Sequence, residues 1–105
     1  MKNSDFPLDV QIMNIAMNMA RIGNWVADCY EDKKDLIKRI IQETDTFMYD
    51  LPSQSISKNF KPTLDKFSSE FEQLKKEHIT KKNRLFWAER ALTWANILQH
   101  RARLV

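Results

Sequence analysis

Histidine and cysteine, the side chains most often used for catalysis and for transition-metal sites, are few in this sequence. It has two histidines, His78 and His100, and one cysteine, Cys29. A di-iron site in a helical bundle needs a glutamate three residues before each ligating histidine, but Lys75 and Ile97 occupy those positions. Cys29 is far in sequence from both histidines, so the spacing does not indicate a cysteine and histidine nucleophile. We therefore expect no catalytic residue, metal site or cofactor, and we expect that the protein is not an enzyme.

The counts of cysteine and glycine exclude further classes of protein. A single cysteine excludes a disulfide framework and a zinc site built from several thiolates. A single glycine in 105 residues excludes glycine-rich phosphate loops, dinucleotide-binding fingerprints and most tight β-hairpins. Lys2 is followed by polar residues and Pro7, so we expect no secretory signal. No uncharged run in the sequence approaches the ~18 apolar residues of a membrane span. We expect a cytoplasmic protein that does not enter a membrane.

One group of side chains has the types needed to bind an anion or a small ligand. Arg90, Trp94 and Arg101 lie on the last periodic segment of the chain. An arginine beside an apolar helical face must find a partner or reach water, since a buried unpaired charge costs several kcal/mol. Two interpretations remain open. Arg90 pairs with an acid such as Asp28 or Glu43, or it lines an anion or ligand site at the edge of the domain with Trp94 and Arg101.

The charge is distributed unevenly along the chain. Residues 1–52 contain six basic and nine acidic residues, whereas residues 53–105 contain eleven basic and five acidic residues, giving net charges of −3 and +6. The two halves are expected to attract each other, within one chain or between two chains. The alternative is a surface that binds nucleic acid or another polyanion. Its candidate residues are Lys75, Lys76, Lys81, Lys82, Arg84, Arg101 and Arg103.

The elements that position these side chains are predicted from apolar periodicity. The first stripe has alternating spacings of four and three, as in an amphipathic helix. Its members are Leu8, Ile12, Ile15, Met19, Ile22, Val26 and Cys29. Ser4 or Asp5 is the expected cap, with Pro7 in the first turn. A second stripe runs from Tyr30 to Leu51, and the eight-residue step from Cys29 to Ile37 predicts that it is out of phase with the first.

A turn is therefore expected near residues 28–33, and a single bent helix is the alternative. A third helix begins at Pro62, and a fourth begins after a cap at Thr80 and continues to about Leu104. We predict an all-α domain spanning residues 1–105. Its fold is an antiparallel four-helix bundle, made of two helical hairpins joined by a Pro/Ser-rich loop near residues 52–61.

The first and last helices carry more apolar residues than one buried face requires. On the first helix, a second apolar band leaves only a polar wedge containing Gln11, Asn14, Asn18, Arg21 and Asp28. The candidate interface residues are Val10, Met13, Ala16, Met17, Ala20, Phe86 and Ile97. A second copy of the chain would bury this surplus by an isologous contact. The alternative is that the first helix lies between several partners within one domain.

These observations lead to one main functional hypothesis with two alternatives. The main hypothesis is a small cytoplasmic interaction module that forms a homodimer and binds another protein through an apolar helical surface. The alternatives are a nucleic-acid or polyanion-binding protein that uses the basic second half, and a helical bundle that binds a small ligand beside Arg90. Helical bundles host unrelated functions, so the architecture does not decide between them.

Overall fold

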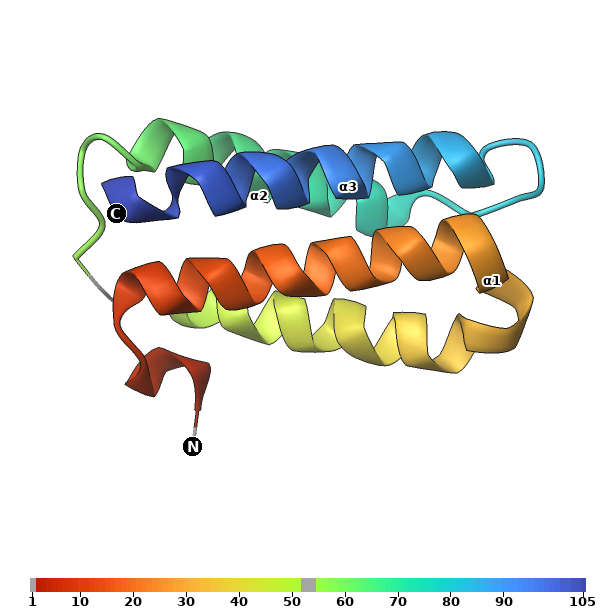
Figure 1. The fold of residues 1–105 in the computed structure, drawn as a ribbon, viewed down its shortest axis with the longest axis horizontal. Coiled ribbons are helices and arrows are strands. Elements are labelled where there is room, and N and C mark those ends of the chain that lie inside the picture. Colours follow the sequence, from red (N-terminus) through yellow and green to blue (C-terminus); the bar gives the residue numbers. More distant parts are fainter. Residues whose placement is uncertain (1, 52–54) are drawn as a thin grey trace.

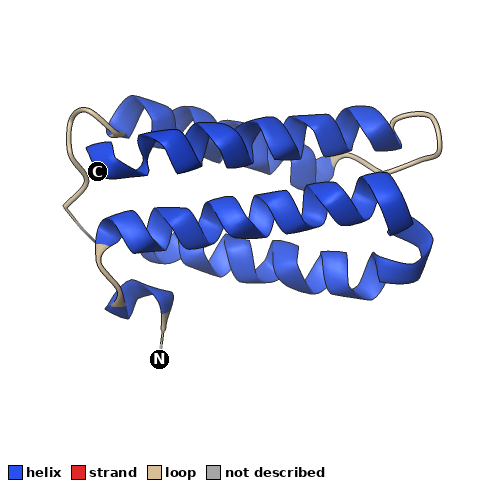
Figure 2. Ribbon diagram, viewed as in Figure 1, coloured by secondary structure: helices blue, strands red, loops and turns tan. Residues whose placement is uncertain are grey.

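The computed structural model describes residues 2–51 and 55–105, and these residues are folded into helices joined by short connections (Figures 1 and 2). The helices are α1 (Leu8–Asp50), α2 (Lys61–Lys76) and α3 (Arg84–Arg101), with short 3-10 turns η1 (Asn3–Asp5) and η3 (Ala102–Leu104). No strand occurs within the two described ranges. The predicted all-α class is therefore confirmed.

The described chain contains three helices where four were expected, because the first two are joined without a loop. α1 changes direction at Cys29, the one residue inside it with non-helical dihedral angles (φ −151°, ψ 42°). The two arms of α1, residues 8–28 and 30–50, lie side by side and antiparallel (Figure 1). The turn expected near residues 28–33 is thus present, in the form of the bent helix that was the alternative.

A buried polar contact holds the two arms of α1 together. The Asn18 side-chain amide donates to Thr44 Oγ1 at 3.2 Å and to Glu43 Oε1 at 3.1 Å. Thr44 Oγ1 in turn donates to the Ile40 carbonyl at 2.8 Å. Asn18 and Thr44 are 4% and 0% exposed. Because an unmade hydrogen bond costs most in the interior, this contact favours one register of the arms over others.

A polar stripe on a helix is usually interpreted as facing solvent, but part of the polar wedge of α1 is covered by protein. Gln11 is 1% exposed, and its amide donates to the Phe6 carbonyl at 2.7 Å. Asn14 donates to Asn3 Oδ1 at 2.8 Å. The segment around η1 therefore folds back over the first arm, where backbone and amide oxygens satisfy these donors.

The ends of the helices differ in detail from the predictions. Ser4 and Asp5 belong to η1, so the predicted cap is wrong, and Pro7 occupies the N-cap position of α1. α2 begins one residue before Pro62, and Asn83 is the N-cap of α3 in place of Thr80. Of the predicted loop near 52–61, residues 55–60 are non-helical, and residues 52–54 lie outside the described residues.

The first arm of α1 and α3 approach each other closely at the only glycine of the chain. A Cβ atom added to Gly23 would lie 2.7 Å from Leu92 Cγ and 3.2 Å from the Ala88 carbonyl oxygen. Small residues, which permit close approach of two helix backbones, are buried nearby, including Ala16 at 3% and Ala88 at 2% exposure. The core between the helices is formed mainly by Ile12, Ile15, Met19, Ile22, Val26, Ile37, Leu51, Phe60, Phe67, Phe71, Leu74, Trp87 and Leu98.

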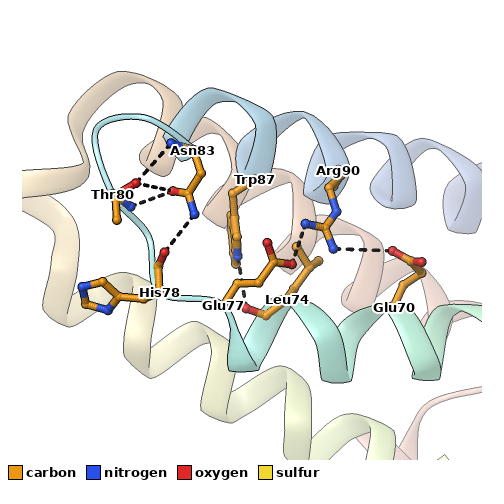
Figure 3. Close-up of polar contacts among 8 residues, drawn as sticks. All are labelled: Glu70, Leu74, Glu77, His78, Thr80, Asn83, Trp87 and Arg90. Carbon is orange, nitrogen blue, oxygen red and sulfur yellow. Dashed lines mark hydrogen bonds and ion pairs between the residues drawn. The ribbon is translucent and has the colours of Figure 1, made fainter.

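α2 packs against α3 and completes the core. The Phe67 and Trp94 rings lie 5.6 Å apart between centroids, and the buried Trp87 indole donates to the Leu74 carbonyl at 3.1 Å (Figure 3). An ion pair between Lys75 and Asp45, 2.6 Å apart, joins α2 to the second arm of α1. All helical segments therefore surround one core.

Adding one methyl group at the α1 and α3 contact tests how tightly these helices are packed. Gly23→Ala gains about 1 kcal/mol of helix propensity but overpacks the contact, which costs about 1–3 kcal/mol. We expect a net loss of about 1 kcal/mol in the free energy of unfolding, measured by urea titration. The Leu92→Ala single variant and the Gly23→Ala/Leu92→Ala double variant complete a double-mutant cycle, which measures the coupling between the two positions. If the contact is close-packed, the double variant loses less stability than the sum of the singles.

Candidate functional site

A cavity of about 580 Å³ lies at the end of the molecule where α1 reverses direction, beside the loop that joins α2 to α3. The charged residues that line it are Asp28, Glu31, Asp32, Lys34, Lys81 and Arg84. The other lining residues are Cys29, Tyr30, His78, Ile79 and Thr80. The cavity thus combines both signs of charge with a thiol and an imidazole.

Arg84 fixes the geometry of this cavity by capping the first arm of α1. Its guanidinium donates to the Val26 carbonyl at 3.2 Å and to the Ala27 carbonyl. The last carbonyls of a helix lack partners within the helix, and a cation is favoured there by the helix dipole. Arg84 therefore stabilises the reversal at Cys29, and it links α3 to the reversal.

The structure brings Cys29 and His78 to one cavity, which the sequence separation concealed. Cys29 is partly buried and His78 is exposed, and neither side chain has a hydrogen-bond partner among the described residues. No group of three or more histidine, cysteine or acidic side chains in the described ranges could hold a metal ion. The cavity thus has a thiol and an imidazole in its lining, but no hydrogen bond joins them, and no third group in the described part of the chain orients them as a catalytic pair.

The loop that forms one side of the cavity is fixed by its own hydrogen bonds (Figure 3). Asn83 Oδ1 accepts from the Thr80 amide at 2.6 Å, and Asn83 Nδ2 donates to the His78 carbonyl at 2.9 Å. The Thr80 hydroxyl accepts from the Asn83 amide at 3.2 Å. These reciprocal bonds order the turn that leads into α3 and so place Arg84.

Arg90 is paired with acids of α2, and not with the acids of α1 proposed from the sequence. Its guanidinium lies 2.5 Å from Glu77 Oε2 and 3.8 Å from Glu70 Oε2 (Figure 3). It also stacks over the Phe86 ring, 5.4 Å from the ring centroid. The pairing with Asp28 or Glu43 is therefore wrong. That expectation failed because the sequence could not show that α2, and not α1, lies against this side of α3.

The three residues proposed to line an anion or ligand site do not form one site. Arg90 and Trp94 line a cleft of about 130 Å³, but Arg101 does not. Arg101 instead donates to Thr63 Oγ1 at 3.4 Å. Trp94 is 8% exposed and contributes to the core. With its charge already matched by two carboxylates, Arg90 has little capacity left for an external anion.

The basic residues of the second half lie in two separate places. Lys75 is paired with Asp45 and Glu72, and Arg84 is bonded to backbone carbonyls. Lys81 lines the cavity, and Lys76 and Lys82 are exposed near it in sequence, whereas Arg101 and Arg103 lie at the far end of α3. The 18 residues of α3 separate these groups by about 27 Å at 1.5 Å per residue. They do not form one continuous basic surface.

Hydrogen bonds and ion pairs raise the pKa of two lysines. At Lys75, burial opposes the charged form, but the hydrogen bonds to Asp45 and Glu72 outweigh it, and the pKa is raised. At the exposed Lys34, the hydrogen bond and charge of Glu31 raise the pKa. A raised lysine pKa adds stability below the unfolded value and loses it as pH rises through the folded value, so both contributions are present at neutral pH.

The candidate interface residues are divided between α1 and α3 and differ in exposure. Ala16 is 3% exposed and belongs to the core, while Met13, Ala20 and Ile97 are partly buried against it. Met17 is 54% exposed on α1, and Val10 is partly exposed. Phe86 is 61% exposed on the side of α3 next to α2, where it covers Arg90.

Comparisons with protein-family profiles, with curated proteins and with solved structures found no match to this chain. Within the described ranges, no helix has both the length and the apolar character that crossing a membrane requires. Functional inference therefore rests on the residues themselves.

Removing the cap at the reversal of α1 should lower stability. Hydrogen bonds from a charged donor contribute about 1.5–3 kcal/mol, so Arg84→Ala is expected to lower the free energy of unfolding by about 2 kcal/mol. Arg103→Ala is the matched control, because Arg103 is exposed and has no bonded partner among the described residues. Equal urea midpoints for the two variants would contradict a capping role for Arg84.

Proposed function

We propose that this protein is a small, non-enzymatic interaction module that self-associates through the outward face of the first arm of α1. The observation that carries the proposal is Met17, which is 54% exposed on a folded helix. Val10, Met13 and Ala20 are partly exposed at helical spacing around it. Contiguous apolar surface on a folded protein commonly marks a binding site for another protein.

A second copy of the chain is the partner that this face suits best. Methionine side chains adapt to irregular surfaces, and alanine lets two helices approach closely. In an isologous contact the same face is buried on both copies, which needs no other component. Phe86 and Ile97 belong to α3 and not to the first arm of α1, so we do not include them in this contact.

We also propose that the two arms of α1 act as two separate members of an antiparallel four-helix bundle. Supporting this, Asn18 and Thr44 are bonded between the arms, and Lys75 of α2 is bonded to Asp45 of the second arm. The single cysteine supports a cytoplasmic location, since reduced thiols are usual there.

A charge placed at the centre of the face should dissociate the dimer. We expect Met17→Glu to raise the dimer dissociation constant at least about tenfold, which corresponds to 1.4 kcal/mol, in sedimentation equilibrium. Tyr49→Glu is the matched control, because Tyr49 is 84% exposed on the other arm of α1. A wild-type chain that remains monomeric at millimolar concentration would exclude the proposal, as would equal dissociation constants for both variants.

A further inference from the structure

The reversal of α1 depends on the backbone of a single residue. Both arms have helical dihedral angles up to Cys29, where φ is −151° and ψ is 42°. No loop residues separate the arms. Rotation of the Cys29 backbone into the helical region would therefore convert the hairpin into one straight helix of 43 residues, about 64 Å long at 1.5 Å per residue.

The buried residues of the two arms are in phase for such a straight helix. Each of three buried residues in the first arm has a buried counterpart 18 residues later, and 18 residues make five turns of 3.6. The pairs are Met19 with Ile37, Ile22 with Ile40, and Val26 with Thr44. The phase change predicted from the step between Cys29 and Ile37 is thus wrong. A straightened α1 would present a single apolar stripe along its whole length.

The hydrogen bonds at the reversal can be exchanged without leaving a carbonyl unpaired. In the observed hairpin, Arg84 donates to the Val26 and Ala27 carbonyls. In a straight helix the amides of Tyr30 and Glu31, four residues further on, would bond the same two carbonyls. Opening the hinge therefore replaces the bonds from Arg84 with ordinary helical bonds.

A straight α1 cannot fold back on its own first arm, so its second arm needs another surface. We propose that two copies of the chain exchange their second arms, residues 30–50, through opening at Cys29. Each second arm then packs against the first arm of the other copy and remakes the contacts between the arms, including that of Asn18 with Thr44, while the bonds at the reversal change as described above. The surface this occupies is the core face of the first arm. Met17 is exposed beside this face, in a groove that it lines with Glu43 and Phe47 of the second arm, and it is not among the core residues that the exchange must bury again.

Several features of the chain set the balance between the hairpin and the exchanged dimer. Exchange is concentration-dependent, because two chains lose independent motion while the contacts within each unit are conserved. The absence of loop residues favours exchange, since short connections between packed elements promote swapping. Arg84 favours the hairpin through its cap, and Glu31 and Asp32 favour it because acids are stabilising at the start of the second arm.

The contact between Asn18 and Thr44 allows the exchange to be tested directly. Two variants are made in a Cys29→Ser/Met17→Glu background, one with Asn18→Cys and one with Thr44→Cys. They are mixed, unfolded in urea, refolded together at high concentration and oxidised, and the products are separated on a non-reducing gel. In an exchanged dimer, position 18 of one copy meets position 44 of the other. About half of the dimers should then become covalent, since random pairing makes half of them mixed.

Two controls separate exchange from other contacts. Pairing the Asn18→Cys variant with a Tyr49→Cys variant should give only background cross-linking, because Tyr49 is 84% exposed whereas Asn18 is 4% exposed and bonded to Thr44. The Met17→Glu background removes the surface proposed above for self-association. A covalent product in this background therefore supports exchange whether or not that surface forms a dimer.

Changes at the hinge should shift the exchanged fraction in opposite directions. Arg84→Ala removes the cap and should increase the covalent product severalfold. Insertion of Gly-Ser-Gly after Cys29 supplies a loop for the hairpin and should reduce the product to background. Absence of covalent product above background in both the parent pair and the Arg84→Ala pair would overturn the proposal. An undiminished product in the insertion variant would also overturn it.

Discussion

The close approach of the first arm of α1 to α3 is the constraint on which the rest of the structure depends. At Gly23 the two helices lie too close for even a methyl group to fit without displacing Leu92. A glycine within a helix lowers helix stability, so its presence is offset by the packing that it permits. This contact sets Ala88 of α3 against the first arm, and Arg84 of the same helix reaches the reversal of α1. The position of α3 in turn determines where Arg84 caps the first arm and where the cavity beside the reversal lies.

The contacts of α3 explain why the most suggestive charged residues are structural. Arg84 and Arg90 lie six residues apart on α3, and each is bonded to a neighbouring element. Arg84 satisfies carbonyls of α1, and Arg90 neutralises Glu77 and Glu70 of α2. The two arginines thus attach α3 to both of its neighbours. Because both guanidinium groups are already bonded within the protein, the exposed apolar surface is the more specific candidate for binding.

The apolar pattern of the sequence predicted the helices well, because helical periodicity is a local property. Ile12, Ile15 and Met19 are buried as their spacing predicted. Polar contacts were predicted poorly, because they depend on which elements become neighbours. Nothing near Asn18 in sequence indicates that its amide is buried against Thr44, 26 residues away. The meeting of Cys29 with His78 at one cavity was likewise invisible, and the importance of Gly23 could not be seen from its rarity alone.

The cap on the first arm of α1 also has a consequence for the order in which the chain folds. Synthesis proceeds from the N-terminus, and segments can fold as they emerge. Both arms of α1 are complete at Asp50, whereas the side chain that caps the reversal belongs to Arg84, further along the chain. A nascent α1 therefore exists for a time without the contact that stabilises its reversal. The contact that stabilises the direction of the second arm forms only after α3 has been synthesised, so the fold of the first helix depends on the last.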